Sequence, residues 1–482
     1  MTPVALSADA ISVMDRLTTA AENNDQASII KFIKKKDNPN LSQADGMTAL
    51  LWAAYHDNDA MVRALIQSGA DVSAANRYGV TAISFACANG NSDLVKLLLE
   101  NGADPNISLK GGETALMTAS RTGRLGAVTA LLKHGAQVNA KERRGQTAIM
   151  WAAAEGHADV VDALIRGGAD FRTPLESGFT PLCFAVRNGR IAVTRRLLSA
   201  GVDVNHAMTK ANGGRNKPVK NTSLLLLAME SGHYELAEVL LVAGADPNDA
   251  RTGFTPLHAM SWIRKPEKGD NESGTPPPIG SGRLSSLQFV QCLVKHGAVV
   301  NYQKKSNGGG HRKISTKGTT PFLCAAGTAD VEYMKTLLAL GADWKIKNDN
   351  GHTALIMAAG IGEKPEGDGA GTKSEHLNAV KFLLELGENI DAVDKNGETV
   401  MHAAAYKSLP KVVMLLADRG ADIKIWATPS KKGRTPLSIA QGYRPGNFKP
   451  SFETVEAIKK VMIAQGVTPP APPKKRDEKW SD

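Results

Sequence analysis

The sequence predicts an all-α solenoid in which about twelve helix–turn–helix repeats stack side by side. A phrase of two leucines followed by Gly-Ala-Asp, or a close variant, recurs at a spacing of 33 residues, with its glycine at Gly69, Gly102, Gly135, Gly168 and Gly201. The 482 residues exceed the roughly 250–300 at which one hydrophobic core stops growing. The aromatic content of 5% indicates packing from leucine and small residues. Together, these observations favour a repeat array over several globular domains.

Composition excludes three other classes of protein. The hydrophobic fraction of 42% is too high for a disordered chain. The longest apolar runs, such as 224–229, are far too short to cross a bilayer, so we expect no membrane span. Four cysteines cannot form a disulfide framework in a chain of this length.

The helices of one repeat can be derived from residues 147–170. Thr147 is placed to cap a first helix with its hydroxyl, alanines keep that helix thin, and Gly156 ends it. A second helix follows, ended by the left-handed conformation that Gly167-Gly168 supplies. Its apolar face comprises Val160, Val161, Leu164 and Ile165.

The same pattern continues, with insertions, through the second half of the chain. The repeat glycine recurs there at Gly244, Gly297, Gly341, Gly387, Gly420 and Gly466. Counting back one period from Gly69 reaches Lys36, after a degenerate first repeat. We therefore divide the chain into an N-terminal capping repeat (1–42), regular repeats (43–201), repeats with insertions (202–466) and a mobile Pro/Lys-rich tail (467–482).

The repeat resembles the ankyrin family, whose period is 33 residues. Residues 255–259, Thr-Pro-Leu-His-Ala, are similar to that family's T-P-L-H-x-A signature, and 48–50, 114–116, 147–149, 180–182 and 353–355 are variants of it. Residues 145–153 look like those of bacterial ankyrin proteins. The resemblance implies helix pairs joined by finger turns between repeats, with His258 and His402 tying neighbouring turns together by hydrogen bonds.

The insertions fall on two edges of the predicted stack. Segments 206–222, 303–318 and 424–434 lie in finger turns between repeats, whereas 264–283, 361–375 and 442–451 lie between the two helices of one repeat. The three finger segments contain no Asp or Glu. The predicted contact residues on these segments are Lys210, Arg215, Lys217, Lys220, Lys304, Lys305, His311, Arg312, Lys313, Lys317, Lys431, Lys432 and Arg434.

Two interpretations of these basic finger segments remain open. Lysine-rich loops can simply keep a solenoid soluble. Alternatively, three segments without any acid form a surface for an acidic protein face or for a polyanion such as nucleic acid. No recognised nucleic-acid motif accompanies the charge.

A second set of contact candidates lies late in the first helix of several repeats, on the expected concave groove. Exposed aromatic and arginine side chains often anchor interfaces, which selects Tyr55, His56, Arg121, Arg187, Trp262 and Tyr406. The earlier stripe of Trp52, Phe85, Trp151 and Phe184 is more typical of core. Trp344 and Trp426, near finger turns, could stack on a ligand or shield a neighbouring finger.

No catalytic or cofactor site is evident. Residues 367–374 superficially resemble a phosphate-binding loop, but Thr372 occupies the place of a required glycine and no strand precedes them. We expect no cofactor, metal or small-molecule substrate. The predicted function is a non-enzymatic protein-binding scaffold, whose partner is held by the groove and the inserted loops. The alternatives are polyanion binding and an accessory role in an enzyme complex.

The N-terminal residues carry no signal-peptide pattern. We therefore expect a cytoplasmic location, or a periplasmic or secreted one if residue 1 is a processed end.

Overall fold

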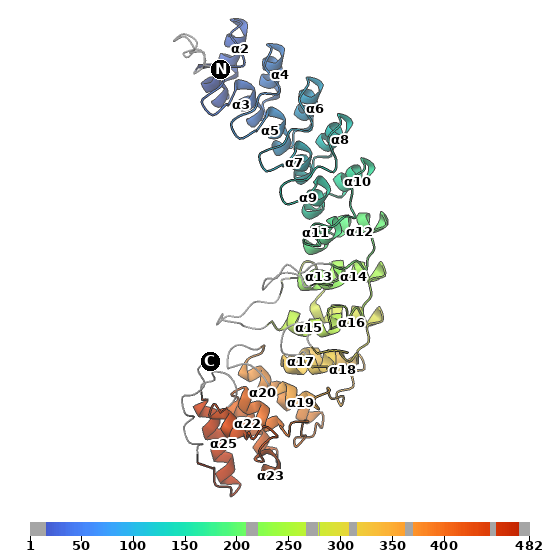
Figure 1. Ribbon diagram of the computed structural model, residues 1–482, viewed down its shortest axis with the longest axis vertical. Helices are drawn as coiled ribbons and strands as arrows, with labels where there is room; N and C mark the ends of the chain where they lie inside the picture. Colours follow the sequence, from blue (N-terminus) through green and yellow to red (C-terminus); the bar gives the residue numbers. More distant parts are fainter. Residues whose placement is uncertain are drawn as a thin grey trace. The chain divides into compact units, whose positions relative to one another are not determined.

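The computed structural model describes residues 16–208, 220–266, 278, 280–307, 316–361, 370–443 and 450–471. Within them every regular element is a helix, accompanied by three isolated β-bridges (Figure 1). The predicted all-α repeat solenoid is therefore confirmed. Residues 1–15 and 472–482, at the two predicted ends, lie outside the described residues.

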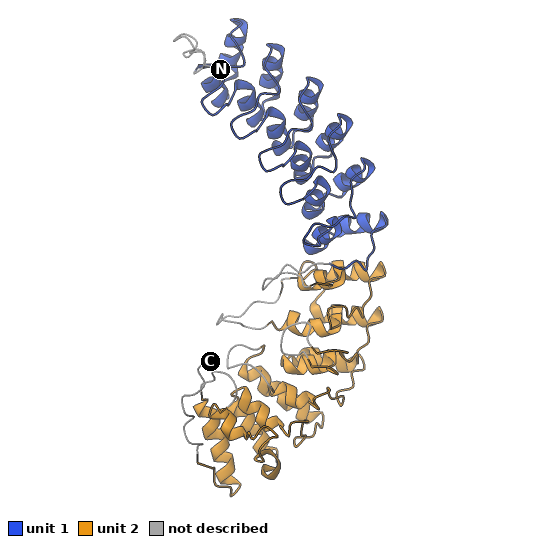
Figure 2. Ribbon diagram, viewed as in Figure 1, with its two compact units in different colours: residues 1–212 blue, residues 213–482 orange. Residues whose placement is uncertain are grey.

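The chain forms two compact units, residues 1–212 and 213–482 (Figure 2). In the first unit a helical segment over 16–22 precedes eleven helices. These are α2 (Gln26–Lys34), α3 (Ala49–Tyr55), α4 (Asp59–Gln67), α5 (Ala82–Asn89), α6 (Ser92–Glu100), α7 (Ala115–Thr122), α8 (Leu125–Lys133), α9 (Ala148–Glu155), α10 (Ala158–Arg166), α11 (Pro181–Arg187) and α12 (Ile191–Ser199).

The second unit continues the alternation of a first and a second helix in each repeat. Its helices are α13 (Leu224–Glu230), α14 (Tyr234–Val242), α15 (Pro256–Arg264), α16 (Ser286–Lys295), α17 (Pro321–Gly327), α18 (Val331–Ala339), α19 (Ala354–Ala358), α20 (Lys373–Glu385), α21 (Val400–Tyr406), α22 (Pro410–Asp418), α23 (Ile423–Trp426), α24 (Pro436–Ala440) and α25 (Phe452–Ala464). Apart from the short α23, the described helices form twelve pairs, as the period predicts.

Threonine begins most of the first helices. The hydroxyls of Thr48, Thr114 and Thr180 each accept a backbone N–H from the first turn that follows, which satisfies one of the amides left without a partner at a helix start. Thr147 is an exception and corrects the prediction. It occupies the N-cap position of α9, but its hydroxyl caps no amide.

Glycine ends the helices as expected. Gly156 and Gly168 have φ of 95° and 86°, which is the left-handed region that glycine adopts without steric cost. The apolar face of α10 is buried at Val160, Val161 and Leu164, whereas Ile165 is only half-buried.

Candidate functional site

The finger turns share one backbone design. In regular turns the first residue donates its N–H to the carbonyl four residues on, as from Asp394 to Glu398 at 2.9 Å and from Ser430 to Arg434 at 2.8 Å. A glycine with positive φ precedes the closing residue, for example Gly397 at 79°. The turn therefore places two residues, here Lys395 and Asn396, at its tip.

The 303–318 insertion opens one such turn without losing its closure. Lys304 N–H donates to Thr319 O at 3.0 Å, and Gly318 N–H donates to Lys304 O at 2.8 Å. Lys304 and Thr319 therefore occupy the first and last positions of an ordinary turn, with the inserted residues between them.

Neighbouring finger tips in the second unit are joined backbone to backbone. Asp349 N–H donates to Lys317 O at 2.9 Å, Lys395 N–H to Asn350 O at 2.9 Å, and Lys431 N–H to Asn396 O at 2.7 Å. Four consecutive fingers thus form one hydrogen-bonded row, which fixes where the backbones of Lys317, Lys395 and Lys431 lie.

Several predicted basic residues are exposed on the fingers of the second unit, namely Lys220, Lys305, Lys317, Lys431 and Lys432. The Lys317 ammonium lies 3.7 Å from the Asp349 carboxylate, and the Lys305 ammonium lies 5.9 Å from the centre of the Tyr302 ring. The remaining predicted basic residues of the first two fingers lie outside the described residues: Lys210, Arg215, Lys217, His311, Arg312 and Lys313.

Lys304 corrects the expectation of an exposed basic side chain. It is only 3% exposed, and it occupies the first position of its turn. Burial lowers the pKa of the Lys304 ammonium. Arg434, by contrast, occupies the closing position of its turn and is half-buried, with its guanidinium donating to the Tyr406 hydroxyl at 3.1 Å.

Counting charges in the insertions alone does not find two exposed lysines at the fingers. Lys347 precedes a turn-opening residue, and Lys395 occupies a tip. Aligning every turn on its glycine would have found both. We define the finger lysine row as the exposed lysines in, or directly before, four consecutive turns: Lys305, Lys317, Lys347, Lys395, Lys431 and Lys432.

The two tryptophans near the fingers differ from one another. Trp426 lies on α23 and is 2% exposed, so its ring packs within the repeat. Trp344 is half-buried, with the Lys345 ammonium 5.4 Å from its ring centre.

Tyr55 and His56, two of the residues predicted to line the groove, contact other residues of the first unit. Tyr55 is 52% exposed and lies edge-on to Phe85, with ring centres 5.5 Å apart. His56 is half-buried, and its Nε2 lies 2.7 Å from Glu22 O in the preceding repeat. Both residues lie at the end of α3, and Tyr55 is the more accessible of the two.

The arginine candidates are exposed beside aromatic rings. The Arg121 guanidinium lies 5.4 Å from the Trp151 ring centre and 3.6 Å from the Glu113 carboxylate. Arg187 lies 5.9 Å from the Phe179 ring centre. The stripe of Trp52, Phe85, Trp151 and Phe184 is half-buried.

Two groove candidates of the second unit are buried, so the expectation of exposed rings is wrong for them. Trp262 is 8% exposed and packs edge-on against Phe254, with ring centres 4.7 Å apart. Tyr406 is 7% exposed, and its hydroxyl donates to Glu398 Oε1 at 2.9 Å. Each ring finds a partner from the finger turn that precedes its own helix.

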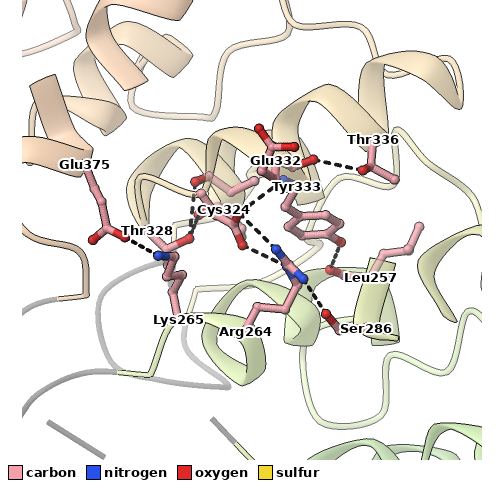
Figure 3. Close-up of polar contacts among 12 residues, drawn as sticks. Leu257, Arg264, Lys265, Ser286, Cys324, Thr328, Glu332, Tyr333, Thr336 and Glu375 are labelled. Atoms are coloured by element: carbon pink, nitrogen blue, oxygen red, sulfur yellow. Dashed lines mark hydrogen bonds and ion pairs between the residues drawn. The ribbon is translucent and has the colours of Figure 1, made fainter. Parts of the chain in front are cut away.

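The bases of two helix-turn insertions are held by a polar cluster (Figure 3). Arg264, at the end of α15, makes two hydrogen bonds to Asp330, at 2.8 and 3.2 Å, and Asp330 caps α18 in the next repeat. Lys265 pairs with Glu375, whose carboxylate accepts Thr372 N–H at the start of α20. The cluster therefore links three consecutive repeats.

The far end of the 264–283 insertion contacts the preceding repeat. The Ser281 hydroxyl lies 2.7 Å from His233 Nδ1, and Arg283 N–H donates to Glu235 Oε1 at 2.6 Å. These contacts tie the bases of the helix-turn insertions into the stack.

The signature histidines have the structural role expected of them. His258 Nδ1 lies 2.7 Å from Thr255 Oγ1, and its Nε2 lies 3.0 Å from Thr319 O of the next turn. His402 makes the corresponding contacts with Thr399 and Arg434 O. Burial lowers the pKa of each imidazole from 6.5 to about 4.

The part of the chain that the structure describes also holds buried thiols. Its four cysteines are free and buried, and burial raises the pKa of Cys87 and Cys324 to about 12. No group of three or more His, Cys, Asp or Glu side chains there could hold a metal ion. None of the described helices has the length and apolar character needed to cross a membrane.

Comparison with known proteins shows the family. A model described as ankyrin repeats (3 copies) matches residues 17–108, 139–208 and 370–456. Models for ankyrin repeats (many copies) and for a single ankyrin repeat match residues 92–132 and 220–252.

Among similar proteins, Ankyrin repeat and SOCS box protein 6 of Homo sapiens is 26% identical over 181 residues, which cover 37% of this chain and 34% of that protein. Nuclear factor NF-kappa-B p105 subunit of Gallus gallus is 30% identical over 202 residues, 33% of this chain and 20% of that protein. A Danio rerio protein named as palmitoyltransferase ZDHHC13 is 27% identical over 152 residues, 29% and 22% respectively. The chain thus spans about a third or less of these relatives. By its repeats and its family-model matches, it belongs to the ankyrin repeat family.

Proposed function

We propose that this chain is a scaffold that binds an acidic face of a protein partner through the finger lysine row of its second unit. Ankyrin repeats indicate a protein–protein interaction scaffold, and the family is typically non-enzymatic. The particular surface and the acidic character of the partner are the finer parts of the proposal.

The observation that carries the proposal is the joined row of finger tips. Exposed lysines at unconstrained loop ends lose side-chain and backbone freedom when they bind, and that loss weakens binding. Here the backbone bonds at Lys317, Lys395 and Lys431 already hold the tips in place. A preorganised positive edge of this kind favours an acidic partner and accelerates its association.

Exposed residues near the ends of first helices in the first unit support a secondary contact. Tyr55, Arg121 and Arg187 are exposed, and tyrosine and arginine are frequent anchors of protein interfaces. Trp262 and Tyr406 are buried, so they are not expected to touch a partner directly.

Quantitative affinity purification from the native cell tests the proposal with matched variants of the full chain. One variant carries Lys395→Glu, Lys431→Glu and Lys432→Glu on the fingers. The control carries Lys381→Glu, Lys411→Glu and Lys460→Glu on exposed helical faces of the same unit. Both change the charge equally, so nonspecific electrostatics affects both.

We expect the finger variant to recover at least about tenfold less partner protein than the parent chain. Each Lys→Glu change replaces the attraction between a lysine and a partner carboxylate by repulsion between two carboxylates. The control should retain most of the partner protein. Equal retention by both variants would contradict the proposal, and so would recovery of nuclease-sensitive nucleic acid in place of protein.

A further inference from the structure

Resting on the function proposed above, we propose that the finger lysine row binds an extended acidic segment whose Asp or Glu residues recur at every third position. The segment would run along the row and present one carboxylate to each finger. The inference specifies the conformation and sequence pattern of the partner.

The spacing of the fingers follows from their backbone bonds. Chains joined by such bonds lie about 4.8 Å apart, as in a β-sheet. Each finger is a tight turn with two arms, which are paired to each other through Asp394 N–H and Glu398 O. The arm that holds Lys395 donates to the preceding finger, and the arm that begins at Asn396 accepts from the following one. One finger therefore advances the row by about 10 Å.

A polyproline II segment matches this advance. It rises about 3.1 Å per residue with three residues per turn, so every third side chain lies on one edge, about 9.3 Å from the last. In a β-strand, residues three apart point to opposite faces. The polyproline II conformation is also common in unfolded acidic chains, so binding requires little rearrangement of the segment.

An acidic α-helix rises about 1.5 Å per residue, so it would match the advance of about 10 Å per finger only with one acid at every seventh residue. The tips at Asp349, Asn350, Lys395, Asn396 and Lys431 offer polar groups rather than an apolar surface. Short helices are marginal in water unless an apolar face is buried, so the row favours an extended partner.

The acids on these fingers leave most of the row accessible. Asp349 pairs with Lys317, while Asp394 is buried and accepts N–H groups of its own turn. The Asp343 and Asp422 carboxylates each accept a local backbone N–H at 2.9 Å. The exposed side chains of Lys395, Lys431 and Lys432 are therefore the principal contacts.

Fluorescence anisotropy with the full chain at low salt tests the inference. The first probe is a labelled ten-residue peptide with four glutamates, one at every third position, separated by Pro and Ser. The second has the same composition with the four glutamates contiguous. A labelled single-stranded oligonucleotide of ten bases is the third.

The regularly spaced peptide should bind about tenfold more tightly than its clustered isomer. Lys395→Gln, Lys431→Gln and Lys432→Gln together should weaken it about tenfold, whereas Lys381→Gln, Lys411→Gln and Lys460→Gln should change it by less than about twofold.

The other results separate the two proposals. Equal affinity for the two peptides, with the finger variant still impaired, would overturn the spacing inference and leave the acidic-partner function standing. Equal loss in both variants would overturn the function itself. Tighter binding of the oligonucleotide through the same lysines would overturn both in favour of nucleic acid.

Discussion

Lys304 and Lys317 lie at the two ends of one insertion, yet only Lys317 can meet a partner. Lys304 is the first residue of the turn, and both its N–H and its carbonyl pair across the base of the finger. Its side chain is buried close to His258, where its charge further lowers the pKa of an imidazole already depressed by burial. At the scale of single residues, therefore, position in the turn decides whether a lysine is part of the surface or part of the core.

Acid should destabilise the second unit through His258. Its pKa falls from 6.5 to about 4 in the folded chain, so the unfolded chain binds the proton more tightly. Stability is then lost as pH falls from about 6.5 to about 4, by about 3 kcal/mol at most for this residue. Urea unfolding at several pH values, followed by circular dichroism, measures it.

His258→Gln can keep a hydrogen bond to Thr319 O without titrating, so its stability should fall less over this range. Parallel pH dependence in the variant and the parent protein would contradict the assignment.

At the scale of elements, the joint between fingers is the feature that holds the row together. Gly318 has φ of +82°, and a Cβ added there would lie 2.6 Å from Asp349 Oδ1 and 2.8 Å from Asp349 N. Asp349 N–H is the donor that joins the finger containing Gly318 to the one after it. A side chain at Gly318 would therefore strain the turn and separate the two tips.

Gly318→Ala should destabilise the second unit by about 1–3 kcal/mol more than Gly387→Ala. Gly387 has a similar φ of +87°, but an added Cβ meets nothing within 4 Å. Both variants incur the cost of a left-handed alanine, and only Gly318→Ala adds the clash. Denaturant titration compares them; equal destabilisation would show that the tips need not touch.

The helix-turn insertions have their own link between repeats. Arg264, Asp330, Lys265 and Glu375 connect three repeats at the bases of two insertions. Of the two ion pairs, Arg264–Asp330 is the buried, doubly hydrogen-bonded one, and it is costly to break because one charge would remain without its partner.

At the scale of the whole molecule, the 33-residue period was sufficient to predict the repeats. The period fixes helix starts at threonines such as Thr180 and helix ends at glycines such as Gly156. It could not show that Thr147 leaves its hydroxyl out of the cap, because that depends on the rotamer its neighbours allow.

The candidate surface was predictable only in part. The charge of the finger insertions pointed to Lys305, Lys317, Lys431 and Lys432, all exposed. Burial of Lys304, Trp262 and Tyr406 follows from how each turn closes against the next repeat, which charge counting does not capture. Lys347 and Lys395 were missed because they lie in turns of ordinary length.

The central claim is that carboxylates of a partner protein lie against the finger lysine row. Zero-length carbodiimide cross-linking in the native cell, followed by mass spectrometry, tests it directly, because the reagent joins a lysine amine only to a carboxylate in contact with it. We predict cross-links from Lys395, Lys431 and Lys432 to Asp or Glu of another protein. Cross-links confined to Lys381, Lys411 and Lys460, or to the first unit, would contradict the account.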